Sequence, residues 1–354
     1  MNIIKKFKVF EKMGISESSL MYVEFILKEY KDILEKFLPS DSNEISESRE
    51  YSFEDLLHIK KRWTWKDFPI SSMEIKYTIT KKSPEEFDKK FTNGNHIKDY
   101  IGTGACYAIG TKENGGSYII DEDNQRVLHL KLDIGSILRG ELSNTDGLLI
   151  EMESSISHEL NHAFEFWKRE VSGKGGIDTK LTYALDVNRS KVSKDIFNYW
   201  DSEIGTFIYW SEEHEIRAMV QDSLGYVKKY SVEDMKDKCP SWEASTRMIN
   251  FNSKKFRSDI IRLVNDKYGD RVDPEILLSR MKNSLSNEMR DQQIDLKDLK
   301  QDKPSLSGEK IRKMSVDKFL EYAQRRINNA GRMLRKRILK LYSLKNTKTN
   351  EIIF

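Results

Sequence analysis

The chain has very few cysteines, which argues against two kinds of architecture. Cys106 and Cys239 are the only two among 354 residues, and they lie far apart in the sequence. Two isolated thiols form neither a disulfide framework nor a cysteine-based metal site. We therefore expect free thiols in a reducing compartment rather than a bridge.

Long apolar runs are also missing. No window approaches the roughly 20 apolar residues needed to cross a bilayer. The N-terminal stretch 1–14 is basic, but no apolar run follows it, which argues against a secretory signal peptide. These absences predict a soluble protein, either cytoplasmic or associated with a phage particle.

The overall charge of the chain gives no indication of an acidic or a basic partner. Acidic and basic residues nearly cancel, leaving a formal net charge of +3. Binding to nucleic acid or to another acidic partner must therefore rest on a local cluster. The one clear cluster is the basic stretch 310–348, where apolar residues recur at helical spacing. It predicts either a docking helix for nucleic acid or another acidic surface, or an ordinary packed helix with a solvated basic face, which we favour.

The patterns along the chain predict an α+β fold. The sequence alternates at 73–80, 105–111, 117–120 and 127–134, and we interpret these runs as a small sheet of about four strands. In the last run Leu128, Leu130, Leu132 and Ile134 share one face, and His129, Lys131 and Asp133 share the other. From about residue 145 onward helical periodicity dominates.

Three segments follow from this organisation. Residues 1–70 form an N-terminal helical segment, with a helix at 16–38 and a polar linker at 40–50. Residues 71–230 hold the predicted sheet and two long helices, at 146–169 and at 202–224, the second closed by Gly225. Residues 231–354 are a helical, basic C-terminal region.

The clearest chemical signal is His158-Glu159-Leu160-Asn161-His162. Two histidines four residues apart on a helix place both imidazoles on one face, where both can bind one zinc ion. Glu159 projects beside such an ion, where its carboxylate can take a proton from water that the ion has made acidic. The opposite side of the helix is apolar, which lets it pack against a core; its residues include Leu149, Met152 and Ile156. The alternative is that this spacing arose by accident.

A catalytic zinc ion needs a third protein ligand and one open position. Glu215 is the leading candidate, because it lies on the predicted second helix with the small Ala218 one turn later. His214 and Glu212 are the main rivals. Glu212 and Asp222 are also candidates to accept a hydrogen bond from a ligand imidazole. A solvated acidic face is the alternative interpretation of this segment.

The segment 158–164 resembles the active-site helix of the zincin metallopeptidases, and 215–218 looks like the glutamate helix of their gluzincin branch. The resemblance implies a zincin-like domain at 71–230, with His158, His162 and Glu215 as ligands of one catalytic zinc ion. It also implies that Glu159 is the general base and proton shuttle. The substrate would be a peptide or protein, paired with an edge strand that we expect at 127–134.

Two features of the sequence depart from related patterns. Many gluzincins carry an acidic residue four positions after the ligand glutamate, whereas this chain has Met219 there. No third histidine extends the first motif and no methionine turn is recognisable, so the metzincin branch does not fit. No motif identifies the group that stabilises the oxyanion; the candidates are Tyr183, Tyr209, His214 and Arg217.

The sequence therefore supports a zinc-dependent peptidase as the leading hypothesis. Two alternatives remain open. The chain could be a catalytically idle structural or interaction protein, such as part of a phage particle, in which zinc only stabilises the domain. It could also be a toxin or effector protease directed at one host protein.

Overall fold

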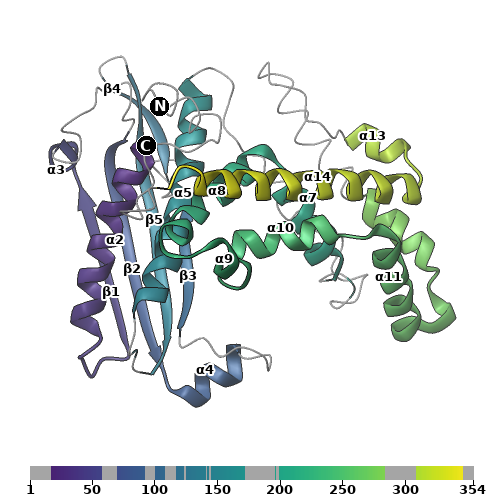
Figure 1. The fold of residues 1–354 in the computed structure, drawn as a ribbon, viewed down its shortest axis with the longest axis horizontal. Coiled ribbons are helices and arrows are strands. Elements are labelled where there is room, and N and C mark those ends of the chain that lie inside the picture. Colours follow the sequence, from purple (N-terminus) through teal and green to yellow (C-terminus); the bar gives the residue numbers. More distant parts are fainter. Residues whose placement is uncertain are drawn as a thin grey trace. The chain divides into compact units, whose positions relative to one another are not determined.

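The computed structural model combines helices with one mixed sheet, so the predicted α+β class is confirmed (Figure 1). It describes residues 17–57, 70–91, 100–107, 117–122, 125–140, 142, 145–171, 196, 199–283 and 308–345. The chain divides into two compact units. Unit 1 comprises 1–168, 217–235 and 341–354, and unit 2 comprises 169–216 and 236–340. These units differ from the three consecutive segments expected from the sequence.

The sheet belongs to unit 1 and has five strands. They are β1 (Glu44–Tyr51), β2 (Ile70–Lys82), β3 (Tyr100–Tyr107), β4 (Tyr118–Glu122) and β5 (Gln125–Arg139). The order is β1-β2-β5-β3, and β4 also pairs with β5. β2 and β5 are parallel, and every other pair is antiparallel.

β5 lies in the centre of the sheet and not at its edge. β2 pairs along one side of β5, while β3 and β4 follow one another along the other side. The expectation that 127–134 is an edge strand open to a substrate is therefore wrong. The predicted alternation is confirmed: the even-numbered residues of 128–134 are buried, and the odd-numbered ones lie on the other, more exposed face.

The predicted polar linker at 40–50 is also wrong, because most of it forms β1. This edge strand has few apolar residues, and polar side chains hold it against the preceding helix, α2 (Glu17–Phe37). Arg49 pairs with Glu29 of that helix, and the Tyr51 hydroxyl donates to the same carboxylate at 2.6 Å. Apolar periodicity cannot detect a strand stabilised in this way.

The core of unit 1 joins α2, the sheet and α5 (Asp146–Val171). Both helices contribute to the same apolar cluster as β2 and β5, so both cover the same sheet face. Burial raises the pKa of the Tyr30 phenol in α2, so it stays neutral and shares a 2.6 Å hydrogen bond with Ser136 Oγ of β5. The predicted helix at 16–38 is thus confirmed, and its apolar stripe belongs to the core.

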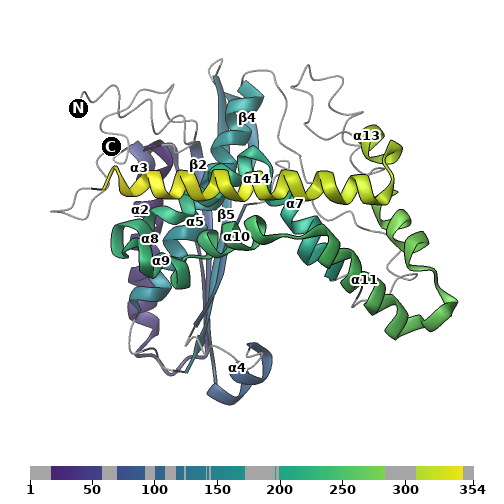
Figure 2. The same cartoon turned by 45° about the vertical axis from the view of Figure 1, so that its right-hand side comes forward.

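The remaining helices are short, apart from α8, α11 and α14. They are α3 (Phe53–Leu57), α4 (Pro84–Phe91), the π-helix η2 (Asp201–Gly205), α7 (Thr206–Trp210), α8 (Glu213–Lys229), α9 (Val232–Lys238), α10 (Pro240–Asn250), α11 (Ser253–Tyr268), the 3-10 helix η3 (Gly269–Arg271), α13 (Gly308–Lys313) and α14 (Val316–Tyr342), which Figure 2 shows from a second side. Within the ranges given above, no helix has both the length and the apolar character needed to cross a membrane.

The predicted helix at 202–224 is interrupted and then extended. α7 ends at Trp210 and α8 begins at Glu213, with a turn in which Ser211 Oγ donates to the Ile208 carbonyl at 2.6 Å. Gly225 does not end α8. A Cβ atom there would lie 3.0 Å from Glu153 Oε2, so this glycine leaves room for the Glu153 side chain of α5.

The packing of unit 2 depends on α14, whose buried apolar stripe includes Phe319, Ile327 and Leu334. Phe319 stacks on Trp200, which also contacts Phe256 of α11. The predicted packed helix at the C-terminus is therefore confirmed. Cys239, before α10, is buried and forms no disulfide, as expected.

Replacement of Gly331 by alanine is expected to destabilise unit 2. A Cβ atom at this position of α14 would lie 2.8 Å from Met248 Cβ and 3.0 Å from two backbone atoms of α10. Such overpacking typically costs about 1–3 kcal/mol, although alanine is the better helix former. Denaturant unfolding would measure this loss. Leu339→Ala, at an exposed position of the same helix, should have little effect; an equal loss in both variants would contradict the close contact.

Candidate metal centre

The two motif histidines lie on α5, one turn apart. The other side of this helix is packed into the core through Met152, Ile156 and Leu160, each 0% exposed. This packing fixes the rotation of α5, so that His158 and His162 face away from the core and remain half-buried. The apolar face expected opposite the histidines is confirmed.

Glu215 lies on the first turn of α8. The boundary between the compact units passes through this helix after Ile216, but α8 itself continues without a break to Lys229. Its later turns are fixed against α5 within unit 1. Gln221 Nε2 donates to the Ser157 carbonyl at 3.1 Å, and Lys228 Nζ lies 2.9 Å from Glu153 Oε1.

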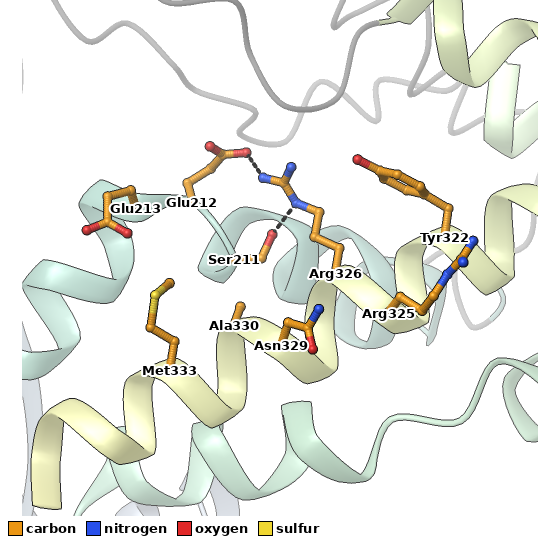
Figure 3. A pocket seen from close by; sticks show the side chains of 9 residues that line it. All are labelled: Ser211, Glu212, Glu213, Tyr322, Arg325, Arg326, Asn329, Ala330 and Met333. Atoms are coloured by element: carbon orange, nitrogen blue, oxygen red, sulfur yellow. Dashed lines mark hydrogen bonds and ion pairs between the residues drawn. The ribbon is translucent and has the colours of Figure 1, made fainter.

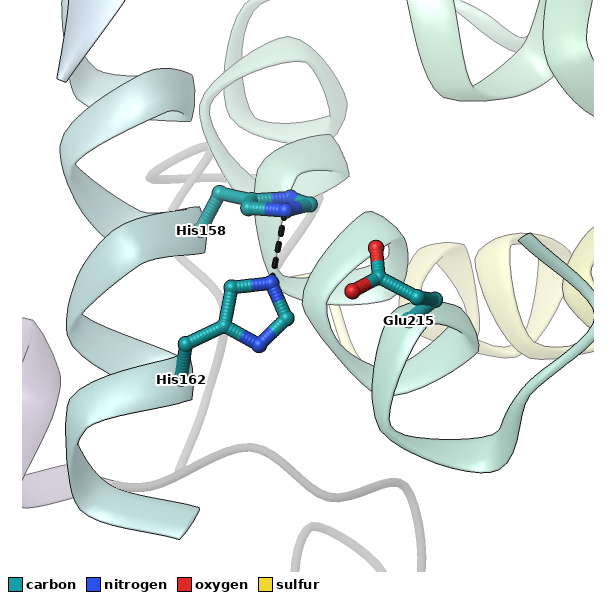
Figure 4. Close-up of side chains that lie close together, drawn as sticks. All are labelled: His158, His162 and Glu215. Atoms are coloured by element: carbon teal, nitrogen blue, oxygen red, sulfur yellow. Dashed lines mark hydrogen bonds between the residues drawn. The ribbon is translucent and has the colours of Figure 1, made fainter. Parts of the chain in front are cut away.

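His158, His162 and Glu215 form a triad that can hold a metal ion (Figure 4). The Nε2 atoms of the two histidines are 2.9 Å apart, and one ligand atom from each residue lies within 4.8 Å of the others. Two nitrogens bound to one tetrahedral ion at about 2.0–2.1 Å would lie roughly 3.3 Å apart. A small rotation of either ring provides that spacing, so the residues fit a metal ion.

Asp222 contacts His158 at Nδ1, the ring nitrogen that does not face His162. His158 Nδ1 lies 3.3 Å from Asp222 Oδ2. When Nδ1 carries the proton and donates it to this carboxylate, Nε2 has its lone pair available for a metal. Of the two residues predicted to accept a hydrogen bond from a ligand imidazole, Glu212 and Asp222, the structure places Asp222 beside such a ring. Its spacing from Glu215, seven residues, places both on one face of α8.

His214 and Glu212 do not join the triad. His214 Nε2 lies 3.3 Å from Glu215 Oε1, beside the triad and not within it. Glu212 instead pairs with Arg326 of α14 and not with a ligand histidine. Among the residues that the structure describes, three side chains converge and not four, which leaves a coordination position for water or substrate.

The remaining candidates lie in different places. Glu159 is half-buried on α5, directly after the first histidine of the triad. His129 lies on the sheet, where it stacks on Tyr118 and contacts Ser72 Oγ at 2.5 Å, so it takes no part in the triad. Tyr183 lies outside the described residues.

Gln221 and Arg326 were not predicted from the sequence. Gln221 fastens α8 to the backbone of α5 through the Ser157 carbonyl, one residue before the first histidine. Arg326 holds the start of α8 from a helix more than 100 residues later in the chain. Neither contact has a local sequence signal, because each depends on tertiary packing.

Replacement of Asp222 by asparagine is expected to weaken metal binding by about 10–100-fold, as is typical when the partner of a ligand histidine is changed. Asparagine preserves the size of the side chain but removes its negative charge. Competition with a chromogenic chelator would measure the dissociation constant. Asp234→Asn on α9, which removes an exposed carboxylate of the Ser231 cap, is the matched control. Unchanged affinity in Asp222→Asn would exclude the positioning role.

Comparisons with protein-family models, with curated proteins and with solved structures found no match to this chain. The function must therefore be inferred from the residues and the geometry.

Proposed function

We propose that this protein is a zinc-dependent metallopeptidase with a zincin-like domain of the gluzincin type. One observation carries the proposal: two histidines one turn apart on a buried helix and a carboxylate from a second helix meet at one point. Two imidazoles and one carboxylate form a donor set found in catalytic zinc sites that keep an open position. His158, His162 and Glu215 would hold the ion.

When bound, zinc would supply a Lewis acid that polarises a peptide carbonyl and lowers the pKa of water. The side chains of this protein supply the other functions. Glu159 is next to a proposed ligand and would accept the proton of the attacking water, then deliver it to the leaving amine. Asp222 would orient the first histidine, and His214 lies 3.3 Å from the carboxylate of Glu215. The contact from Asp222 would hold the first histidine in place before substrate arrives.

The test of this proposal has two parts. Purified wild-type protein should contain about one zinc ion per chain by elemental analysis. It should also cleave peptides in a proteome-derived library read by mass spectrometry, and a chelator should stop the cleavage until zinc is restored. Absence of zinc would overturn the metal site. Stoichiometric zinc without any cleavage would overturn the peptidase and favour a structural zinc protein.

A further inference from the structure

The C-terminal helix α14 contacts the start of α8 through two arginines. Arg326 binds Ser211 Oγ at 2.6 Å and pairs with the Glu212 carboxylate, and Arg337 lies 2.8 Å from Glu213 Oε1. All of these groups belong to unit 2. Glu215, the proposed metal ligand, follows two residues after the last of these contacts. The segment that carries this ligand is therefore held at two points by a single distant helix.

The two arginines lie on one face of α14. They are 11 residues apart, which is three helical turns, and Ala330 and Met333 lie between them on the same face. Arg326, Ala330 and Met333 line one side of a cavity of about 610 Å³, and Ser211, Glu212 and Glu213 line the other (Figure 3). Open space beside the segment 211–213 means that packing alone does not fix it. The arginine contacts add to the backbone hydrogen bonds of this turn, in which the Glu212 N–H donates to the Tyr209 carbonyl at 3.0 Å.

The charges at the start of α8 explain why cations are needed there. Glu212, Glu213 and Glu215 fall within four consecutive residues, and repulsion between them disfavours their close approach. The side chains of Arg326 and Arg337 are only 12% and 18% exposed, so their ion pairs are screened less than surface pairs. Pairing Glu212 and Glu213 with arginines offsets the negative charge next to Glu215.

We propose that Arg326 and Arg337 are positioning residues for the metal centre. They clamp the 211–213 turn and thereby set the position of Glu215 before metal binds. This inference rests on the proposed metal site. It also gives part of the basic C-terminal stretch a role within the fold, because these two cations are engaged by glutamates and are not presented to an outside partner.

The first test measures zinc affinity by chelator competition. Arg326→Met keeps the length of the side chain but removes the charge and both contacts, and we expect the dissociation constant to rise about 10–100-fold. Arg337→Met should act in the same direction with a smaller effect, because Arg337 has one carboxylate partner at 2.8 Å and Glu213 is 47% exposed. Arg326→Lys should restore part of the affinity, because it keeps the charge but loses the forked geometry.

Two matched controls are available on the same helix. Arg325→Met and Lys336→Met each remove one positive charge from an exposed neighbour of a clamp residue. Both should leave the zinc dissociation constant unchanged. If they weaken zinc as much as Arg326→Met does, the effect comes from net charge and the clamp is overturned. If Arg326→Met binds zinc as tightly as the wild type, the clamp is overturned as well.

A second measurement separates the clamp from the metal site itself. Hydrogen–deuterium exchange of the metal-free protein should show faster exchange of the amides at 213–219 in Arg326→Met, by several-fold, than in the wild type or in Arg325→Met. This result would support the clamp even if the wild type held no zinc. Unchanged exchange would overturn the clamp even if zinc binding and peptidase activity were both established.

Discussion

Replacement of Glu159 by glutamine should abolish peptide hydrolysis and leave zinc bound. Glutamine has the size of glutamate but cannot accept a proton from water, and general acid–base groups contribute about 10²–10⁴-fold to a rate. We expect kcat to fall by at least that factor, while the zinc content stays at one ion per chain. Glu159 is half-buried beside the first histidine and is not one of the three converging ligand side chains, so its loss should not release the metal.

The matched control for this variant is Glu151→Gln, the same change on the same helix two turns earlier. It should retain both zinc and activity. Equal turnover by Glu159→Gln and the wild type would end the claim that Glu159 is the base. Loss of zinc in Glu159→Gln would instead mean that this carboxylate supports the metal centre.

Replacement of His162 by alanine should remove the metal and the stability that depends on it. One of three proposed protein ligands is lost, and we expect the zinc dissociation constant to rise by about three orders of magnitude, or ~4 kcal/mol. A ligand at a concentration of 1,000 times its dissociation constant stabilises the folded state by about 4 kcal/mol. The wild type should therefore unfold at a higher temperature with zinc than without it, and the variant should not.

His129→Ala is the control for this experiment, because His129 stacks on Tyr118 in the sheet and lies outside the triad. It should bind zinc like the wild type and keep the zinc-dependent rise in unfolding temperature. A zinc-dependent rise in His162→Ala of the same size as in the wild type would show that the ion binds elsewhere. Loss of zinc in both variants would show that the measurement reports folding and not ligation.

Periodic apolar patterns predicted the elements that form the core of unit 1. Each of these elements buries one face, so the spacing of its apolar residues indicates which side faces inward. They are the helices at 16–38 and 146–169 and the strand at 127–134. The convergence of the two histidines was predictable because they are four residues apart on one such helix. The sequence could predict that Glu215 is a carboxylate on a second helix. Whether that carboxylate lies near the histidines depends on how α8 packs on α5.

The features of the fold that were predicted wrongly depend on contacts between segments far apart in the sequence. β1 is stabilised at an edge by polar partners, so its sequence resembles a linker. β5 was expected at an edge but lies in the centre of the sheet. The order of strands depends on their pairing across the fold, which the sequence of one strand does not record. Gly225 was expected to end a helix, but α8 continues through it, and the absence of a side chain leaves room for Glu153.

The order of the ligands along the chain has a consequence for synthesis. His158 and His162 leave the ribosome well before Glu215, and Arg326 and Arg337 emerge more than 100 residues after Glu215. A nascent chain that carries only α5 has two of the three donors. If the clamp acts as proposed, the newly made protein acquires its full affinity for zinc only after α14 has been synthesised.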